Sequence, residues 1–312
     1  MKALVTGAAG FVGSTLSEAL LDAGHEVVGV DCFLDYYKRE IKEGNLARAR
    51  ESGSYRFVEA SLVTAELGDL LDGVDWVFHQ AAQAGVRASW GDDFRIYSDN
   101  NVFATQRLLE AVRESGVRKF VYASSSSVYG DTDDLPMRET SPTAPVSPYG
   151  VTKLAGEHLT RLYWVNYRVP TVSLRYFTVY GPRQRPDMAF HRFSRAVLED
   201  SEITLYGDGE QSRDFTFIDD IVAANIAAAQ SEAAGRVYNI GGGSRTTVNE
   251  VISTIGGIVG REPRVNRLET QKGDVKHTAA DTSGAARDLG YKPEVGLREG
   301  LSREVEWVRT LL

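Results

Sequence analysis

The stretch that decides the fold is Ala3-Leu4-Val5-Thr6 followed by Gly7-Ala8-Ala9-Gly10-Phe11-Val12-Gly13. An apolar, strand-like run precedes the three glycines, and a helical pattern, Phe11–Ala23, follows from the last part of the motif. The first glycine permits a tight turn, the second lets the backbone approach a pyrophosphate, and the third allows close packing of helix on strand. The phosphates then lie at a helix N-terminus, where free N–H groups favour anions. This segment predicts a dinucleotide-binding site.

An acidic residue, Asp31, ends the next apolar run at about the ~20-residue offset expected for such a site. A carboxylate in this position accepts hydrogen bonds from the adenosine ribose hydroxyls and repels a 2′-phosphate. Cys32, Phe33 and Leu34 follow it, so no arginine or lysine comes directly after the carboxylate. The sequence therefore predicts NAD as the cofactor, in preference to NADP.

Short apolar runs alternate with helical patterns through the first two-thirds of the chain. The predicted strands are Ala3–Thr6, Glu26–Val30, Tyr55–Val58, Trp76–His79, Lys119–Ala123, Thr171–Tyr176 and Val237–Ile240, and the helical patterns include Phe11–Ala23, Asn101–Ser115 and Tyr149–Asn166. These strands are too apolar to alternate, as expected for parallel strands covered on both faces. We predict an α/β fold, a Rossmann-type doubly wound parallel sheet with right-handed crossovers and a smaller C-terminal substrate domain.

The character of the sequence changes after Gly181-Pro182, where a charged, proline-containing stretch, Arg183–Arg192, begins. A helix and a short strand, Ile203–Tyr206, come next, before the chain returns to the sheet. We expect residues 1–181 to form the cofactor-binding domain, with residues 236–261 returning to it. Residues 182–235 and 262–312 are then expected to form the substrate domain.

The bulk properties are those of an ordinary soluble globular protein, because 42% of the 312 residues are hydrophobic and 25% are charged. A formal net charge of −8 argues against nucleic-acid binding, which requires a basic face. A single cysteine, Cys32, allows no intrachain disulfide and suits a reducing compartment. With no signal-like leader and no membrane-length apolar run, the expected location is the cytoplasm. No metal site is predicted.

A second motif, Tyr149-Gly150-Val151-Thr152-Lys153, places a tyrosine and a lysine four residues apart on one helix face. A phenol with a pKa of ~10 is a poor base at neutral pH. A neighbouring ammonium and a positively charged nicotinamide both favour phenolate, so we expect them to lower this pKa. The motif follows the glycine fingerprint and a strand that ends in Ser124-Ser125-Ser126-Ser127-Val128-Tyr129-Gly130.

In this combination of motifs the chain resembles the extended short-chain dehydrogenase/reductases that act on nucleotide sugars, essentially from end to end. The similar segments are Thr6–Gly13, His79–Arg87, Asp99–Val102, Ser124–Gly130, Tyr149–Lys153, Arg175–Pro182, Gly207–Gly209, Arg213–Phe215 and Gly273-Asp274. Two departures stand out. Ser61-Leu62 replaces the acidic–hydrophobic pair that contacts adenine in many relatives, and Lys272 replaces the proline common before Gly273-Asp274.

The resemblance implies that Tyr149 removes the proton of the sugar 4-hydroxyl while the C4 hydride passes to NAD. Lys153 would bind the nicotinamide ribose, and Ser125 would hydrogen-bond the reacting oxygen. The cofactor contacts implied are Gly7, Gly10, Phe11, Val12, Gly13, Asp31, Ala81, Ala82, Gln83, Asn100, Tyr149, Lys153 and Phe177. Arg213 and Asp274 match family positions that meet the UDP phosphates and ribose.

The residues around the serine run favour epimerisation at C4. Dehydratases and decarboxylases of this family typically carry an acidic residue before the Val-Tyr-Gly segment to handle the C5 proton, and this chain has Ser127 there. Ser125, Ser126 and Ser127 supply hydroxyl donors suited to a carboxylate at C5. The segment Arg175–Met188, which contains Thr178 and Arg185, resembles the UDP-glucuronate 4-epimerases. Thr178, Arg185 and Arg87 are therefore further candidates to hold the carboxylate.

We accordingly expect conversion of UDP-glucuronate to UDP-galacturonate through a transient 4-keto sugar with tightly held NAD. A UDP-glucose 4-epimerase and a UDP-glucuronate decarboxylase are the alternative enzymes, and a non-catalytic NAD sensor is the alternative from another class. The helical stretches Asn101–Ser115 and Tyr149–Asn166 also resemble those that form dimer interfaces in relatives, so a homodimer is expected.

Overall fold

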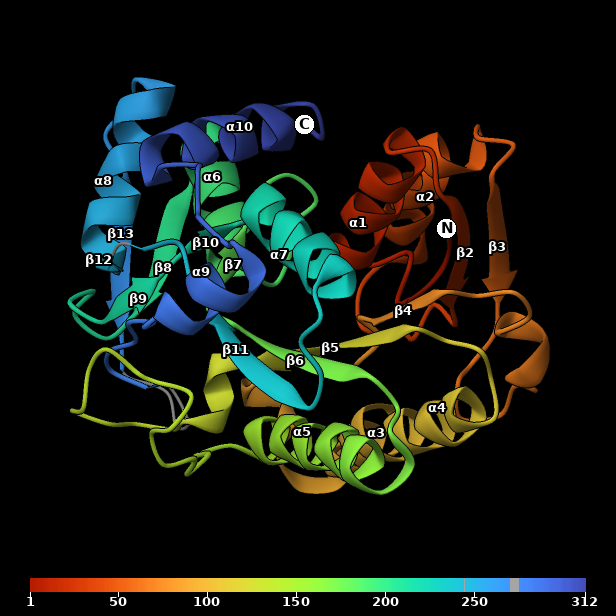
Figure 1. The fold of residues 1–312 in the computed structure, drawn as a ribbon. Helices are drawn as coiled ribbons and strands as arrows, with labels where there is room; N and C mark the ends of the chain where they lie inside the picture. The colour runs from red at the N-terminus through yellow and green to blue at the C-terminus, as the bar shows by residue number, and fades with distance from the viewer. Residues whose placement is uncertain (244, 270–274) are drawn as a thin grey trace.

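The centre of the molecule is a seven-stranded parallel sheet, seen in a computed structural model that describes residues 1–243, 245–269 and 275–312 (Figure 1). Its strand order is β11-β6-β5-β4-β1-β2-β3. The strands are β1 (Lys2–Thr6), β2 (Glu26–Asp31), β3 (Tyr55–Glu59), β4 (Trp76–His79), β5 (Lys119–Ser125), β6 (Thr171–Tyr176) and β11 (Arg236–Ile240). All seven predicted strands are present, with bounds that differ by at most two residues, so the predicted fold class is confirmed.

Helices cover both faces of the sheet (Figure 1). On one face lie α1 (Phe11–Asp22), α2 (Arg39–Arg50) and α7 (Ile218–Gln230). On the other lie α3 (Phe94–Tyr97), α4 (Ala104–Arg113) and α5 (Pro148–Tyr167). The predicted helix from Asn101 differs at its start, because Ser98–Phe103 winds as a π-helix before α4 begins. Short 3₁₀ turns span Gly68–Leu70, Arg87–Ser89, Gly91–Asp93 and Ser126–Val128.

The strand order reverses between β1 and β4, which are neighbours in the sheet although two strands intervene in sequence. In open α/β sheets the crevice outside the carboxyl ends of the strands at such a reversal is where ligands bind. The buried runs of β1 and β4, from Ala3 to Val5 and from Val77 to Phe78, make the sheet rigid beneath this crevice. The fold therefore places the glycine segment after β1 and the serine run after β5 at the same edge.

The remaining elements form a group beside the β11 edge of the sheet (Figure 1). They comprise α6 (Ala189–Leu198), α8 (Val248–Val259), α9 (Ser283–Leu289), α10 (Leu297–Arg309) and the two-stranded pairs β7 (Val179–Tyr180) with β10 (Thr216–Phe217), β8 (Glu202–Tyr206) with β13 (Arg264–Leu268), and β9 (Ser212–Asp214) with β12 (Arg245–Thr247). In the described part of the chain, no helix is long and apolar enough to cross a membrane.

The packing of α7 and α8 can be compared with the expected division of the chain into two domains. β11 joins the sheet beside β6, as the sequence predicted. The following helix, α8, packs against α6 and α10 in the C-terminal group, while α7 packs against α1 over the sheet. The segment 236–261 thus returns to the sheet with its strand, and its helix lies with the C-terminal elements.

Candidate active site

The glycine segment has the backbone geometry that its sequence predicts. Gly7 has a φ of +68°, and a Cβ added to it would lie 2.8 Å from the backbone nitrogen of Ala81. A Cβ on Gly13 would lie 2.1 Å from the carbonyl oxygen of Gly7. Gly10 precedes α1 and donates its N–H to the Gly7 carbonyl at 3.0 Å. Because side chains are excluded at Gly7 and Gly13, the turn stays narrow and the N-terminus of α1 is open to an anion.

Asp31 accepts backbone N–H groups from the glycine turn and from the segment that follows β2. Its Oδ2 accepts the N–H of Ala9 at 3.1 Å, and its Oδ1 accepts that of Phe33 at 2.8 Å. Burial raises the pKa of the carboxyl group, and these backbone hydrogen bonds and the Lys42 ammonium oppose the increase. Lys42 was not singled out in the sequence. Its Nζ donates to the Leu34 carbonyl at 2.6 Å and lines the same cavity, bringing a positive charge near the ribose-binding position.

One cavity of about 430 Å³ runs along the carboxyl edge of the sheet. The predicted site residues that line it are Gly7, Gly10, Phe11, Val12, Gly13, Asp31, Ala81, Ala82, Gln83, Asn100, Ser125, Ser126, Ser127, Tyr149, Lys153, Phe177, Thr178 and Arg185. Ser61 is not part of the lining, whereas its neighbours Ala60 and Leu62 are. The cavity therefore joins the predicted cofactor and sugar positions into one continuous site.

Arg87 and Arg213 do not line this cavity. The guanidinium of Arg87 lies over the Tyr206 ring, 4.5 Å from its centroid. Arg213 donates to the carbonyl oxygens of Ser212, Val275 and Lys276, at distances of 2.5 to 3.0 Å. Both side chains contact the C-terminal group of elements. Asp274, with Lys272 and Gly273, lies outside the described residues.

Tyr149 and Lys153 lie on successive turns of α5 and both face the cavity. The Lys153 ammonium is 6.0 Å from the centroid of the Tyr149 ring and donates to the Ala123 carbonyl at 2.8 Å. Burial lowers the pKa of Lys153 to about 8, and the carboxylate of Glu157 acts in the opposite direction. The ammonium is thus held against the end of β5, next to the tyrosine that it is expected to serve.

The electrostatics of Tyr149 differ from the sequence-based expectation. Burial raises the pKa of the phenol, and the influences that lower it are the charge of Arg185 and a hydrogen bond from Ser125. Lys153, to which the sequence assigned this effect, is not among them. The Lys153 ammonium donates to a backbone carbonyl, and Arg185 lines the cavity together with Tyr149. Arg185 therefore has two candidate roles.

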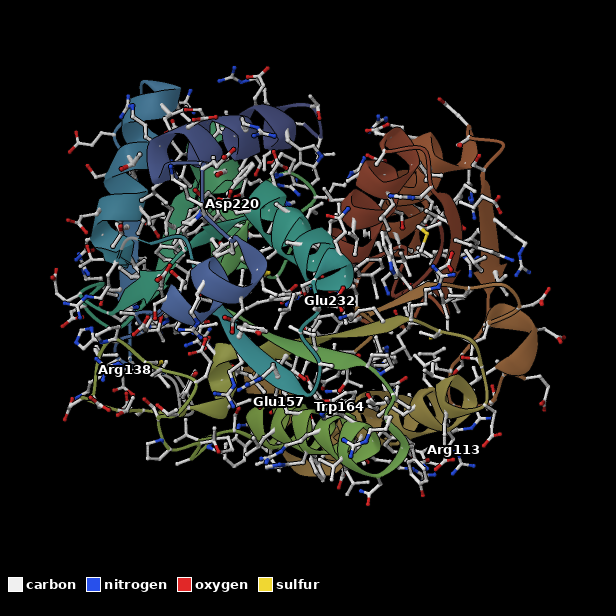
Figure 2. All side chains as sticks on the ribbon, in the orientation of Figure 1. Arg113, Arg138, Glu157, Trp164, Asp220 and Glu232 are labelled. Carbon is white, nitrogen blue, oxygen red and sulfur yellow. The ribbon has the colours of Figure 1, made fainter. Side chains whose placement is uncertain are left out.

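A buried hydrogen-bond network fixes α5 to the ends of β5 and β6. Glu157, on the turn after Lys153, accepts Nε and Nη2 of Arg175 at 2.8 and 2.7 Å and the hydroxyl of Ser124 at 2.5 Å. The charged side chains of this pair are 5% and 4% exposed. Figure 2 shows Glu157 on α5 where the helix faces the sheet. The network fixes the helix that carries Tyr149 relative to the serine run, and no local sequence pattern indicated this pairing.

Asn101, in the π-helix, connects three parts of the site. Its Oδ1 accepts the Gln83 N–H at 2.7 Å, and its Nδ2 donates to the Gln83 carbonyl at 3.0 Å and to the Thr152 hydroxyl at 2.9 Å. The preceding residue, Asn100, lines the cavity. A π-turn often marks a functional site, and here it lets Asn100 face the cavity while Asn101 bonds to α5. The sequence prediction included only Asn100.

At the other end of the cavity the serine run, Thr178 and Arg185 come together. The backbone N–H of Ser127 donates to the Ser125 hydroxyl at 3.1 Å, which shapes the turn after β5. Thr178 follows β6, the neighbour of β5 in the sheet. Arg185 pairs with Asp187, with Nε–Oδ1 and Nη2–Oδ2 distances of 3.0 Å each. Hydroxyl donors and a guanidinium therefore surround one part of the cavity, next to the phenol.

The sequence belongs to a known family. The model of the NAD dependent epimerase/dehydratase family matches residues 3–241, so the chain is a member of that family. It is 46% identical to the Bacillus subtilis protein described as an uncharacterized UDP-glucose epimerase, over all of this chain and 99% of that protein. It is 37% identical to the UDP-glucuronate 4-epimerase of Thermodesulfobacterium geofontis, over 97% of this chain and 95% of that enzyme.

A solved structure extends the comparison to the whole fold. The structure is the UDP-glucuronic acid 4-epimerase of Bacillus cereus in complex with UDP-glucuronic acid and NAD. It matches with a TM-score of 0.97 and 44% identity, over all of both chains. The family and the fold predicted from the motifs are thus confirmed.

Proposed function

We propose that this protein converts UDP-glucuronate to UDP-galacturonate by epimerisation at C4, through a transient 4-keto sugar. One observation carries the proposal. A single cavity brings the Tyr149–Lys153 pair together with Ser125–Ser127, Thr178 and Arg185, which are donors suited to a sugar carboxylate. The similarity to UDP-glucuronate 4-epimerases over the full chain supports it.

The residues of the cofactor end fit NAD. The side-chain-free turn at Gly7 and Gly13, the open N-terminus of α1 and the Asp31 carboxylate are suited to a pyrophosphate and a ribose without a 2′-phosphate. Bound there, NAD supplies a hydride acceptor that later returns the hydride to C4. The other predicted cofactor contacts, including Ala81, Ala82 and Phe177, line the same cavity.

The side chains next to the sugar position can carry the proton steps. The Tyr149 phenolate accepts the proton of the 4-hydroxyl, with the charge of Arg185 and a hydrogen bond from Ser125 favouring its ionised form. On the return step the same phenol donates the proton back. Lys153 holds the turn of α5 against β5 through the Ala123 carbonyl. The interactions of Tyr149 with Arg185 and Ser125, and of Lys153 with Ala123, are already present in the protein.

The described residues place no carboxylate in the sugar part of the cavity for chemistry at C5. Among the described residues that line it, Asp31 is the one carboxylate, and it lies at the end of β2. β2 is three strand positions from β5, a separation of roughly 14 Å at the usual strand spacing. Removal of the C5 proton, which a dehydratase requires, therefore has no carboxylate to perform it. Return of the hydride to the opposite face of a rotated ketone needs none.

The test is to incubate the purified protein with UDP-glucuronate and follow the sugar products by NMR. UDP-galacturonate as the main product supports the proposal, and a pentose product would instead identify a decarboxylase. Turnover of UDP-glucose alone would identify a UDP-glucose 4-epimerase. Absence of any turnover by protein that binds NAD would identify a non-catalytic sensor.

We further propose that residues 182–235 and 262–312 supply most of the UDP-binding part of the site. Arg213 and Asp274 remain the candidates for the diphosphate and ribose, and Arg87 remains a candidate for the sugar carboxylate. Arg213 would have to exchange its present contact with the Val275 carbonyl for the nucleotide, and Arg87 its present contact with Tyr206 for the carboxylate. Titration of Arg213→Met with UDP measures this directly, since a lost charge-assisted contact weakens binding by about tenfold or more.

We also infer a homodimer, formed through α4 and α5. Val151, Leu162 and Val165 form an apolar stripe along α5, each about half exposed, and Phe103 lies equally exposed at the start of α4. Apolar stripes of this kind on adjacent helices are typical of helix-bundle interfaces. Light scattering of the wild type and of Leu162→Glu tests it, with the variant expected to be monomeric. The single free cysteine, Cys32, supports a location in the reducing cytoplasm.

A further inference from the structure

Arg185 already has a counter-ion in the protein itself. Its Nε and Nη2 atoms bond to the two carboxylate oxygens of Asp187, two residues away. The arginine side chain is 20% exposed and the aspartate side chain 42% exposed, so the pair lies at the mouth of the cavity. Arg185 lines the cavity and Asp187 does not. The guanidinium thus faces the sugar position with its positive charge largely balanced from behind.

A third residue holds this pair in place. The hydroxyl of Tyr36, from the loop after β2, donates to Oδ2 of Asp187 at 3.2 Å, although 151 residues separate them in sequence. The Arg185 guanidinium lies 5.5 Å from the centroid of the Tyr36 ring. Tyr36 itself packs on Gly85, where an added Cβ would lie 2.3 Å from its hydroxyl. The position of the ion pair is therefore determined by contacts on several sides.

From this arrangement we propose that Asp187 is a specificity-determining residue, which weakens the preference for an acidic sugar by neutralising Arg185. The inference rests on the proposed function, because it concerns how the same site distinguishes UDP-glucuronate from UDP-glucose. An unbalanced guanidinium in a half-closed cavity favours a substrate carboxylate strongly and is left unpaired by a neutral hexose. With Asp187 present, either sugar meets a paired arginine. The site then accepts both, and hydroxyl donors provide the remaining selectivity.

The decisive variant is Asp187→Asn, which removes the charge and keeps the size. Its amide oxygen can still accept from Arg185, and its amide nitrogen can donate to the Tyr36 oxygen, so the loop retains its contacts. The measured quantity is the uronate preference, defined as kcat/KM for UDP-glucuronate divided by kcat/KM for UDP-glucose. Both substrates carry the same diphosphate, so long-range effects on UDP binding cancel in this ratio. We expect the preference to increase about five- to tenfold, through a lower KM for UDP-glucuronate.

Two controls separate this effect from others. Asp219→Asn removes a carboxylate from a surface pair with Arg303, outside the cavity, and should leave the preference unchanged. Asp187→Asn made in an Arg185→Gln background should also have no effect on the preference, because the proposal acts only through the guanidinium. An unchanged preference in both controls, together with the increase in the single variant, supports the assignment.

A fall in the preference of Asp187→Asn would overturn the proposal, because it would mean that Asp187 serves to position Arg185. An equal change for the two sugars would overturn it as well. A wild-type protein that does not convert UDP-glucuronate at all would instead contradict the proposed function, and the wild-type assay reveals that case before any variant is made.

Discussion

The two ends of the cavity are built in different ways. The cofactor end comes from contiguous sequence, since Gly7 to Gly13 form the turn and the helix start, and Asp31 bonds back to that turn through Ala9. The sugar end is assembled from distant segments, namely the serine run after β5, Thr178 after β6, and Arg185 with Asp187, which Tyr36 contacts from the loop after β2. The cofactor end is thus encoded locally, whereas the sugar end is held by contacts between segments that are distant in sequence.

The largest expected effect lies where the two ends meet. Tyr149→Phe should reduce kcat by about 10²–10⁴-fold, the contribution typical of general acid–base catalysis, because it removes the phenol oxygen and keeps the ring. Binding of NAD and of UDP-sugars, measured by calorimetry, should change little. Substantial turnover by this variant would falsify the assignment of Tyr149 as the base.

A substitution confined to the cofactor end should abolish NAD binding, whichever UDP-sugar is offered as substrate. Gly13→Ala places a Cβ 2.1 Å from the Gly7 carbonyl oxygen, a backbone atom that cannot move without opening the turn. We expect loss of detectable NAD binding and a decrease of about 1–3 kcal/mol in the free energy of unfolding. Gly257→Ala is the matched control, since an added Cβ there meets nothing within 4 Å. Normal NAD affinity in Gly13→Ala would show that the turn tolerates a side chain.

The same contrast explains how much the sequence could predict. The sheet, the glycine turn and the Tyr149–Lys153 pair follow from local patterns, because strand composition and motif spacing act over a few residues. The Glu157–Arg175 pair and the Tyr36–Asp187 contact join segments 18 and 151 residues apart, and no local pattern specifies them. Lys42 could not be predicted for a related reason. It lies on the polar helix α2, and only the position of α2 in the fold brings its side chain to the cavity.

At the sugar end, substitutions of Thr178 and of Arg185 should have different effects on turnover. Thr178→Ala removes one hydroxyl donor, so we expect kcat/KM for UDP-glucuronate to fall about 10- to 100-fold, with little change for UDP-glucose. A less firmly held carboxylate should also align with the C4 ketone more often, giving more CO₂ and pentose by-product, measured by NMR. An equal loss of kcat/KM for both sugars would mean that Thr178 contacts a part of the substrate or cofactor that is common to both reactions.

Arg185→Gln should change the pH dependence of the turnover rate for both sugars. The guanidinium lowers the pKa of the Tyr149 phenol, so its removal raises that pKa. The reaction needs the phenolate, and the acidic limb of the pH–rate profile should therefore move to higher pH with either substrate. Thr178→Ala, whose hydroxyl has no such influence on Tyr149, is the control and should leave the profile in place. An unshifted profile in Arg185→Gln would exclude the electrostatic role of the arginine.

The smallest effect concerns the choice between NAD and NADP. Asp31→Ala removes the carboxylate that is expected to bind the ribose, so NAD affinity should fall about tenfold and the preference for NAD over NADP should narrow. The structure adds a reason for the narrowing, because the ammonium of Lys42 lines the same part of the cavity and is then left without the Asp31 charge that opposes it. Calorimetric titration with each cofactor measures the ratio of the affinity for NAD to the affinity for NADP. In a Lys42→Met background this narrowing of the NAD preference should be weaker, since no cation remains to attract a 2′-phosphate. Asp219→Ala, which removes a carboxylate from the surface pair with Arg303 outside the cavity, should leave the ratio unchanged. Equal affinity of the wild type for the two cofactors would contradict the role given to Asp31, and an Asp31→Ala ratio that does not depend on Lys42 would contradict the role given to the lysine.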